Sequence, residues 1–281
     1  MTDYLALTKP RITLMVVLTS LFGFYLASSG PVDGGLLANL LVGTALSCAG
    51  AGALNMAMER RADGAMHRTR NRPIPSGRVP MGTAISFGGI LATAGVALLA
   101  VKVNALTAGL SAATLVLYLL VYTPLKSRTS LCTVIGAIPG ALPPVMGWAA
   151  ARGSLDAGAW ALFGVLFFWQ LPHFLAIAWM YREDYARAGY PMLPVVDPEG
   201  GSTARQVVLQ TLALVVISLA PVGLGIAGGA YLAGASALGF AFLAFGLAFA
   251  LVRSRERARR LFLASLAYLP GLLGLLAVTA A

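Results

Sequence analysis

Hydrophobic residues form long unbroken runs along this chain, separated by short polar stretches. The run from Ala230 to Val252, for example, contains no charged residue. A helix needs about 20 apolar residues to cross the roughly 30 Å hydrocarbon layer of a bilayer. The period-two alternation that a membrane β-barrel needs is absent. The pattern predicts nine spans, over residues 12–28, 35–58, 82–101, 105–123, 131–151, 157–179, 205–228, 230–252 and 261–280.

The runs predict an all-α membrane protein, because backbone groups in lipid must be hydrogen-bonded within the segment that crosses it. We expect about nine transmembrane helices in a single domain over residues 1–281. Composition agrees, with 58% hydrophobic and 11% charged residues, which is far more apolar than a soluble domain. Lys9 and Arg11 precede the first run as in a cleaved signal peptide, but the run is longer than a signal core. We therefore expect it to remain as the first helix.

Positive charges gather at one side of the predicted spans. Of the 20 Lys and Arg residues, 18 lie near the N-terminus or around the segments after spans two, four, six and eight, and the exceptions are Lys102 and Arg152. Lys and Arg are enriched in cytoplasmic loops, so we predict a multi-pass inner-membrane protein with a cytoplasmic N-terminus and its C-terminus outside. The net charge of +10 then follows from topology. Arginines dispersed over loops without a soluble domain do not indicate a nucleic-acid partner.

Acidic residues are scarce and are concentrated near two loops. Of the ten in the chain, six lie in or beside the segments after spans two and six. They are Glu59, Asp63, Glu183, Asp184, Asp197 and Glu199. We expect the two loops to converge at one end of the bundle and to form the functional site.

The first loop carries oxygen ligands at helical spacing. Asn55, Glu59 and Asp63 are four residues apart at each step, so on a continuing helix they occupy neighbouring turns of one face. The carboxylates repel unless a positive group lies between them, either Arg60, Arg61 or a divalent cation. Mg2+ suits such a set, because it is commonly held by one or two carboxylates plus substrate phosphates. A solvated helix end with ordinary ion pairs is the alternative.

Cationic and aromatic side chains accompany both acidic clusters. Guanidinium groups at this density suit phosphate oxygens, although cytoplasmic loops collect arginines for topological reasons as well. The first loop contains His67, Arg68, Arg70, Arg72 and Arg78; the second contains Tyr181, Arg182, Tyr185 and Arg187; and Lys126 and Arg128 follow span four on the same side.

His173 lies inside the sixth span, next to Pro172. Polar groups at that depth usually face a cavity or a partner. Eleven residues separate it from Asp184, three helical turns, so both would share a face if the helix continued. It is either a histidine hydrogen-bonded between helices or a ligand or proton carrier.

Together these residues resemble the UbiA superfamily of intramembrane prenyltransferases and, within it, the protoheme IX farnesyltransferase branch. Tyr181 and Tyr185 stand where quinone-type relatives carry acidic residues, and the heme branch shares this change together with the upstream histidine. Glu59 stands where Asp is common. The motifs that carry the resemblance are LTKPR at 7–11, Asn55 with Glu59 and Asp63, RTRNRPIPSG at 68–77, YTPLK at 122–126, PHF at 172–174, YREDY at 181–185, AG at 188–189 and PMLP at 191–194.

The resemblance implies a nine-helix bundle around a central cavity, with two acidic motifs at one mouth holding Mg2+ and a prenyl diphosphate. It also implies transfer of the farnesyl group of farnesyl diphosphate to a vinyl group of heme b, with addition of water, giving heme O and diphosphate. The implied protein partners are a heme A synthase or a terminal oxidase assembly. The alternatives are an aromatic quinone precursor or a chlorin as acceptor, or a membrane transporter.

The resemblance also implies a role for each candidate residue. Asn55, Glu59 and Asp63 would bind the metal, and His173 and Tyr181 would lie on the heme side. We count all five as catalytic residues. Glu183, Asp184 and Tyr185 make up the second motif. The diphosphate falls to Lys9, Arg68, Arg72, Arg78, Lys126, Arg128 and Arg182.

Overall fold

Nine helices long and apolar enough to cross a bilayer make up most of residues 2–280, which the computed structural model describes. The prediction of an all-α membrane protein is confirmed, and each predicted span overlaps one of these helices. They are α2 (Pro10–Ala27), α3 (Gly34–Met58), α5 (Met81–Lys102), α6 (Ala105–Val116) continued by η1 (Leu117–Tyr122) and α7 (Thr123–Leu125), α8 (Cys132–Arg152), α9 (Ala157–Met180), α12 (Gly201–Ser218) continued by α13 (Ala220–Gly223), α14 (Gly229–Leu251) and α15 (Arg255–Thr279).

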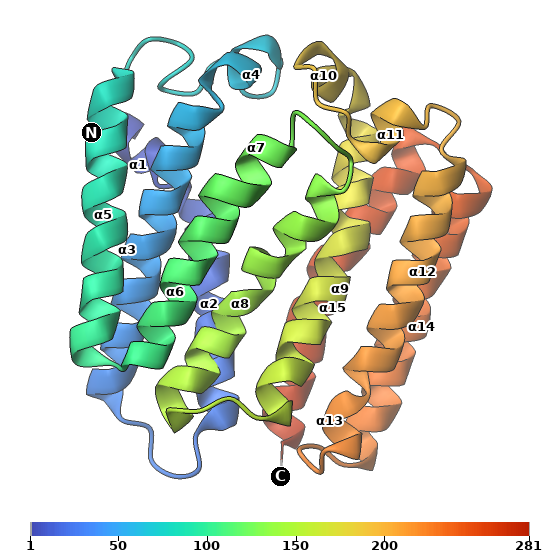
Figure 1. Ribbon diagram of the computed structural model, residues 1–281. Helices are drawn as coiled ribbons and strands as arrows, with labels where there is room; N and C mark the ends of the chain where they lie inside the picture. Colours follow the sequence, from blue (N-terminus) through green and yellow to red (C-terminus); the bar gives the residue numbers. More distant parts are fainter. Residues whose placement is uncertain (1, 281) are drawn as a thin grey trace.

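Short helices that the hydrophobic pattern did not predict connect the spans. Among them, α4, α10 and α11 lie at the same end of the bundle, and the C-terminus lies at the opposite end (Figure 1). Both acidic loops are therefore at one end. The bounds of the short helices are Thr2–Leu7 for α1, Arg60–Ala65 for α4, Arg182–Arg187 for α10 and Leu193–Val196 for α11.

Two predicted spans, the seventh and the ninth, have boundaries that are wrong by several residues. Helix α15 begins at Arg255 and not at residue 261, because the Ser254 side chain caps it by accepting a hydrogen bond from the Arg257 amide at 3.2 Å. Its arginines thus form the first helical turns and not a loop. The seventh span begins at Gly201 and ends at Gly223, which places Arg205 within the helix.

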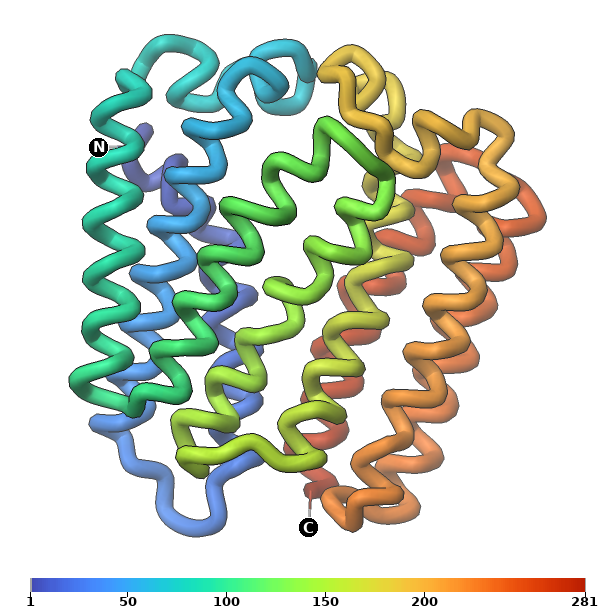
Figure 2. The backbone as a smooth tube through the Cα atoms, in the orientation of Figure 1, coloured from blue at the N-terminus to red at the C-terminus, as the bar shows by residue number. Residues whose placement is uncertain are grey.

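Close backbone contacts hold the helices together, as expected where lipid supplies no hydrophobic drive for helix association. A Cβ atom on Gly50 of α3 would lie 2.4 Å from the Ala92 amide nitrogen of α5, and one on Gly147 of α8 would lie 2.0 Å from the Ser20 carbonyl oxygen of α2. Figure 2 shows α3 and α5 on one side of the molecule, α12 and α14 on the other, and α8 and α9 between them, with α2 running behind α8 and α15 behind α9.

The fourth span contains a π-helical turn, η1, just before Pro124. Proline lacks an amide hydrogen and cannot make the usual i to i−4 bond. In this turn the Thr123 hydroxyl donates to the carbonyl oxygen of Tyr118 at 2.8 Å. π-helical turns occur often at functional sites, and this one leads directly to Lys126.

Candidate active site

Asn55, Glu59 and Asp63 form a buried acidic stripe where α3 leads into α4. Glu59 lies between the two helices with φ −90° and ψ 9°. The Glu59 amide still donates to Asn55 O at 2.9 Å, and the Asp63 amide to Glu59 O at 2.8 Å, so the spacing of one helical turn persists. The three residues are 1%, 7% and 1% exposed. They are not a solvated helix end.

Each residue of the acidic stripe contacts a cation from a different part of the chain, and we call these three cations the basic triad. Such cations offset the large cost of burying a charged carboxylate. Lys9 Nζ donates to Asn55 Oδ1 at 2.6 Å, Lys126 Nζ lies 2.7 Å from Glu59 Oε1, and Arg72 Nη1 lies 2.8 Å from both oxygens of Asp63.

Arg60 and Arg61, two of the candidates for the positive group between the carboxylates, are exposed to solvent. They do not fill that role, because residues one or two positions from Glu59 point away from its face of a helix. The neutralising charge comes from residues that are distant in sequence.

Burial and neighbouring charge shift the pKa values of two members of the triad. For Lys9, burial and then the charge of Arg72 lower the pKa to about 8, although Glu59 acts in the opposite direction. For Lys126, burial lowers the pKa, but Tyr122 and Glu59 outweigh it and raise the pKa well above its usual value. The Lys126 ammonium also lies 4.6 Å from the centre of the Tyr122 ring.

The second loop meets the first through Asp184. This buried carboxylate accepts hydrogen bonds from the backbone amides of His67 at 3.2 Å and Arg68 at 3.4 Å, and it pairs with Arg187. Burial raises its pKa, but these donors outweigh burial and hold the pKa of Asp184 below its usual value. The two loops therefore converge at one end of the bundle, as expected.

The other candidates of the second loop have different surroundings. Glu183 is exposed, and the Arg182 guanidinium lies 4.9 Å from the Trp179 ring centre. The Arg68 guanidinium, from the first loop, lies 5.2 Å from the ring centre of Tyr181. The ring centres of Tyr185 and Tyr190 are 6.3 Å apart.

Like Arg68 and Arg182, the two remaining candidate cations make no hydrogen bond or ion pair with the acidic stripe. Arg78 pairs with Asp3 at 3.0 Å and donates to Asn71 O at 2.9 Å, so it ties α1 to the first loop. Arg128 is exposed. Both lie at the surface of the bundle end that carries the two acidic loops, which we call the functional end.

His173 is held between α9 and α15. Its Nδ1 lies 2.7 Å from Ser265 Oγ, whose hydroxyl donates to the Phe262 carbonyl oxygen at 2.6 Å. With the Ser265 hydroxyl donating to Phe262, the matching tautomer carries its proton on Nδ1 and has a lone pair on Nε2. His173 and Asp184 would share a helical face only if the helix continued, and this condition is not met, because α9 ends at Met180.

The acidic stripe suits Mg2+ by its chemistry. Within residues 2–280, no three His, Cys, Asp or Glu side chains form a metal-binding group. Two carboxylates and one amide oxygen nevertheless match the hard-oxygen sets that hold Mg2+ together with substrate phosphates. Glu59 Oε1 is buried and accepts no hydrogen bond of good geometry, although it is ion-paired.

A hollow of about 730 Å³ opens where the two loops meet the turn between α14 and α15, and we call it the arginine hollow. The sequence interpretation missed Arg253 and Arg255 as site residues because it assigned the whole run of arginines near 255 to topology. The residues that line the arginine hollow are His67, Arg68, Trp179, Met180, Tyr181, Arg182, Glu183, Asp184, Arg187, Arg253, Ser254 and Arg255.

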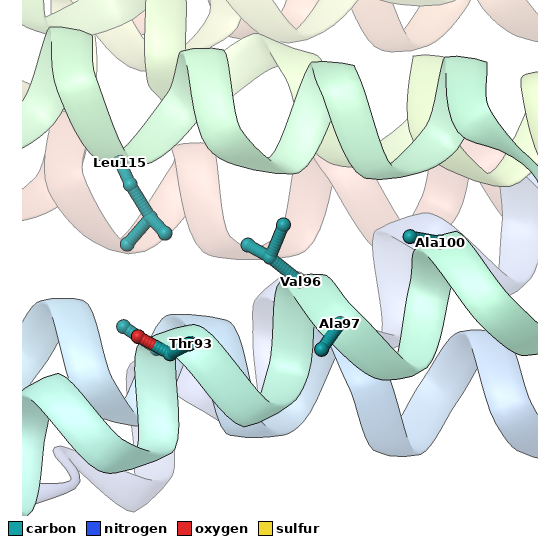
Figure 3. A pocket seen from close by; sticks show the side chains of 6 residues that line it. Thr93, Val96, Ala97, Ala100 and Leu115 are labelled. Atoms are coloured by element: carbon teal, nitrogen blue, oxygen red, sulfur yellow. The ribbon is translucent and has the colours of Figure 1, made fainter.

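A second hollow, of about 360 Å³, lies between α5 and α6. Figure 3 shows Thr93, Val96, Ala97, Ala100 and Leu115 around it. No charged side chain lines this hollow, and Thr93 is its one polar lining residue, so it offers no ionisable group for catalysis.

Comparisons with known proteins agree with the fold and show the family. The model of the "UbiA prenyltransferase family" matches residues 16–269. A "Protoheme IX farnesyltransferase" of Solibacter usitatus is 48% identical over 285 residues, covering 98% of each chain. A solved digeranylgeranylglyceryl phosphate synthase matches with a TM-score of 0.83 at 17% identity, covering 99% of this chain and 97% of that one. A UbiA homolog from Archaeoglobus fulgidus bound to DMAPP and Mg2+ matches with a TM-score of 0.70 at 17% identity, covering 98% and 99%.

Proposed function

This chain belongs to the UbiA prenyltransferase family, and from that premise we propose that it transfers the farnesyl group of farnesyl diphosphate to a vinyl group of heme b. Water adds in the same reaction, and the products are heme O and diphosphate. Full-length identity of 48% to a protoheme IX farnesyltransferase supports this acceptor. The observation that carries the proposal is the Asp184 contact, which joins the two acidic loops above one set of buried cations.

The basic triad supports binding and departure of the diphosphate. As the allylic C–O bond breaks, negative charge grows on the leaving oxygens, and cations placed there stabilise the transition state more than the ground state. Lys126 and Arg72 already carry their charge beside the acidic stripe at 2.7 and 2.8 Å. We assign these two residues, together with Lys9, Arg68 and Arg182, to the diphosphate.

We assign Mg2+ to the acidic stripe, where Asn55, Glu59 and Asp63 would hold it. Bound there, the ion would neutralise charge on the diphosphate as a Lewis acid. Arg72 and Lys126 contact these carboxylates in the structure, so binding of the ion requires that they exchange partners. The diphosphate oxygens offer the new partner.

The acceptor side is assigned to His173 and Tyr181. The free lone pair of His173 Nε2 can accept a proton or bind the heme iron, and Ser265 fixes the orientation of the ring. In the reaction, the vinyl carbon attacks the allylic carbon, the diphosphate leaves, and water adds to the resulting cation and releases a proton.

The orientation in the membrane follows from the positive-inside rule. We propose that the functional end, with α4, α10 and α11, faces the cytoplasm of a bacterial inner membrane, and that the C-terminus lies outside. The residues 1–281 would act as one prenyltransferase domain that hands its product to a heme A synthase or to terminal oxidase assembly.

Incubation of the purified protein with heme b and farnesyl diphosphate, with and without a chelator, tests the proposal. Mass spectrometry should detect heme O only without the chelator. Asp63→Ala should abolish diphosphate release, while Glu256→Gln, a change of a carboxylate that is 70% exposed, should not. Wild-type turnover by the Asp63 variant would falsify the metal assignment. In parallel incubations with a quinone precursor or a chlorin in place of heme b, prenylation of that compound while heme b stays unreacted would refute the acceptor.

A further inference from the structure

The arginine hollow contains more positive charge than its own carboxylates can neutralise. Five arginines and two acidic residues line it. Asp184 is already occupied by Arg187 and by two backbone amides. Within residues 2–280, no Asp or Glu lies within salt-bridge distance of Arg68, Arg182 or Arg255. The hollow therefore suits an anion that comes from outside the chain.

Several of these guanidinium groups are held in place. Arg68 stacks on Tyr181 and Arg182 on Trp179, and Arg253 donates to the Glu199 carbonyl oxygen at 2.9 Å. Ordered arginines lose less side-chain freedom when they bind a carboxylate or phosphate, which they recognise through a planar fork of donors. Arg255 adds its charge at the first turn of α15, where the helix dipole also favours an anion.

The hollow is amphipathic. Trp179 and Met180 contribute apolar surface at the end of α9, and the arginines surround them. Its volume of about 730 Å³ falls within the roughly 300–1,000 Å³ typical of small-molecule sites. His173 lies about 9 Å deeper along α9, at 1.5 Å per residue from Trp179. A ligand that reached from the hollow toward His173 would have to combine an anionic end with a large apolar body.

We propose that the arginine hollow binds the two propionate carboxylates of the tetrapyrrole acceptor, an inference that rests on the proposed function. In protoheme the propionates and the vinyl groups lie on opposite halves of the ring. Carboxylates held by Arg255, Arg68 and Arg182 at the membrane surface would direct the vinyl half into the bundle, toward His173. Arg68 and Arg182 would then lie between the two substrates, while Arg255 would contact the acceptor alone.

Titration of the wild-type protein in phosphatidylcholine nanodiscs, with protoheme and with its dimethyl ester, tests this inference. A charge-assisted hydrogen bond contributes about tenfold in affinity or more. We expect the wild type to bind protoheme at least about tenfold more tightly than the diester. Arg255→Gln should weaken protoheme binding about tenfold and leave binding of the diester unchanged, which also shows that the variant is folded.

Arg259→Gln is the matched control, because this exposed arginine lies one turn further along α15 and does not line the hollow. It should bind protoheme like the wild type. Equal wild-type affinity for protoheme and diester, or equal loss of both in Arg255→Gln, would overturn the inference. An effect of Arg255→Gln that appears only with phosphatidylglycerol in the nanodisc would assign the hollow to a lipid headgroup and overturn it as well.

The kinetic constants separate this inference from the proposed function. Arg255→Gln should raise KM for protoheme and leave KM for farnesyl diphosphate unchanged. A raised KM for farnesyl diphosphate alone would place the diphosphate in the hollow and overturn the inference while the farnesyl transfer stands. Failure of the wild type to prenylate protoheme at all would refute the proposed function itself.

Discussion

Replacing Asp184 by Asn should loosen the contact between the two loops without emptying the space. The backbone bonds from His67 and Arg68 are 3.2 and 3.4 Å long, longer than the usual 2.9 Å, so we assign them about 1 kcal/mol each. Arg187 is 44% exposed, and its ion pair adds about 0.5 kcal/mol after screening by solvent. Asn keeps one acceptor oxygen, so the expected loss is about 1.5 kcal/mol, or about tenfold in a local opening equilibrium.

Hydrogen exchange measured by mass spectrometry gives this quantity directly. Peptides that contain the amides of His67 and Arg68 should exchange about tenfold faster in Asp184→Asn. Glu183→Gln is the matched control, because this exposed neighbour has no side-chain hydrogen bond or ion pair with the first loop among the described residues and should leave exchange unchanged. Unaltered exchange in Asp184→Asn would refute the claim that this carboxylate joins the loops.

The same contact should depend on pH. The folded pKa of Asp184 lies below the usual value of 3.8, so the carboxylate contributes its stabilisation above that pH. The stabilisation is lost as the pH falls through the lowered folded pKa. Protection of the first loop should therefore persist in mildly acidic buffer and decline only in strong acid.

Three further changes test the buried charges and the packing. With a Lys9 pKa of about 8, kcat/KM should fall as the pH rises through about 8, because the ammonium loses its proton, and Lys9→Arg should remove this decline from the pH profile. Lys126→Met should lower kcat/KM for farnesyl diphosphate about 100-fold in a turnover assay, while Lys102→Met at the opposite end should be neutral. Gly147→Ala should destabilise the fold by about 1–3 kcal/mol through overpacking, which a lowered melting temperature would show. Gly274→Ala, whose Cβ meets nothing within 4 Å, should leave the melting temperature unchanged.

The spans could be predicted from sequence because each is a long apolar run whose length the bilayer fixes. The short helices α1, α4, α10 and α11 have four to six residues each, too few to show a helical period. The end of the sixth span at residue 179 was predicted from the end of its apolar run, and α9 ends at Met180. The run alone does not show whether the polar residues that follow continue the helix, so the alignment of His173 with Asp184 could be stated only as a condition.

The sequence could identify residues of the candidate site but not which cation contacts which carboxylate. The i, i+4 spacing of Asn55, Glu59 and Asp63 is local information and survives in the structure. Their cationic partners are up to 67 residues away along the chain, as for Glu59 and Lys126, and only tertiary packing brings Lys9 and Lys126 to the acidic stripe. Arg255 was missed for a related reason: a helix start beside a hollow cannot be distinguished from a positive-inside segment by composition.

The basic triad should couple the binding of diphosphate to the binding of Mg2+. If a diphosphate takes Arg72 and Lys126 as partners, Asp63 and Glu59 remain buried without compensation, which costs several kcal/mol. A divalent cation on the acidic stripe removes that cost, so diphosphate and Mg2+ should each strengthen binding of the other, by equal factors. Calorimetric titration of inorganic diphosphate, with and without Mg2+, measures this coupling without catalysis. Equal diphosphate affinity in both titrations, after correction for complex formation in solution, would show that the cations do not exchange partners.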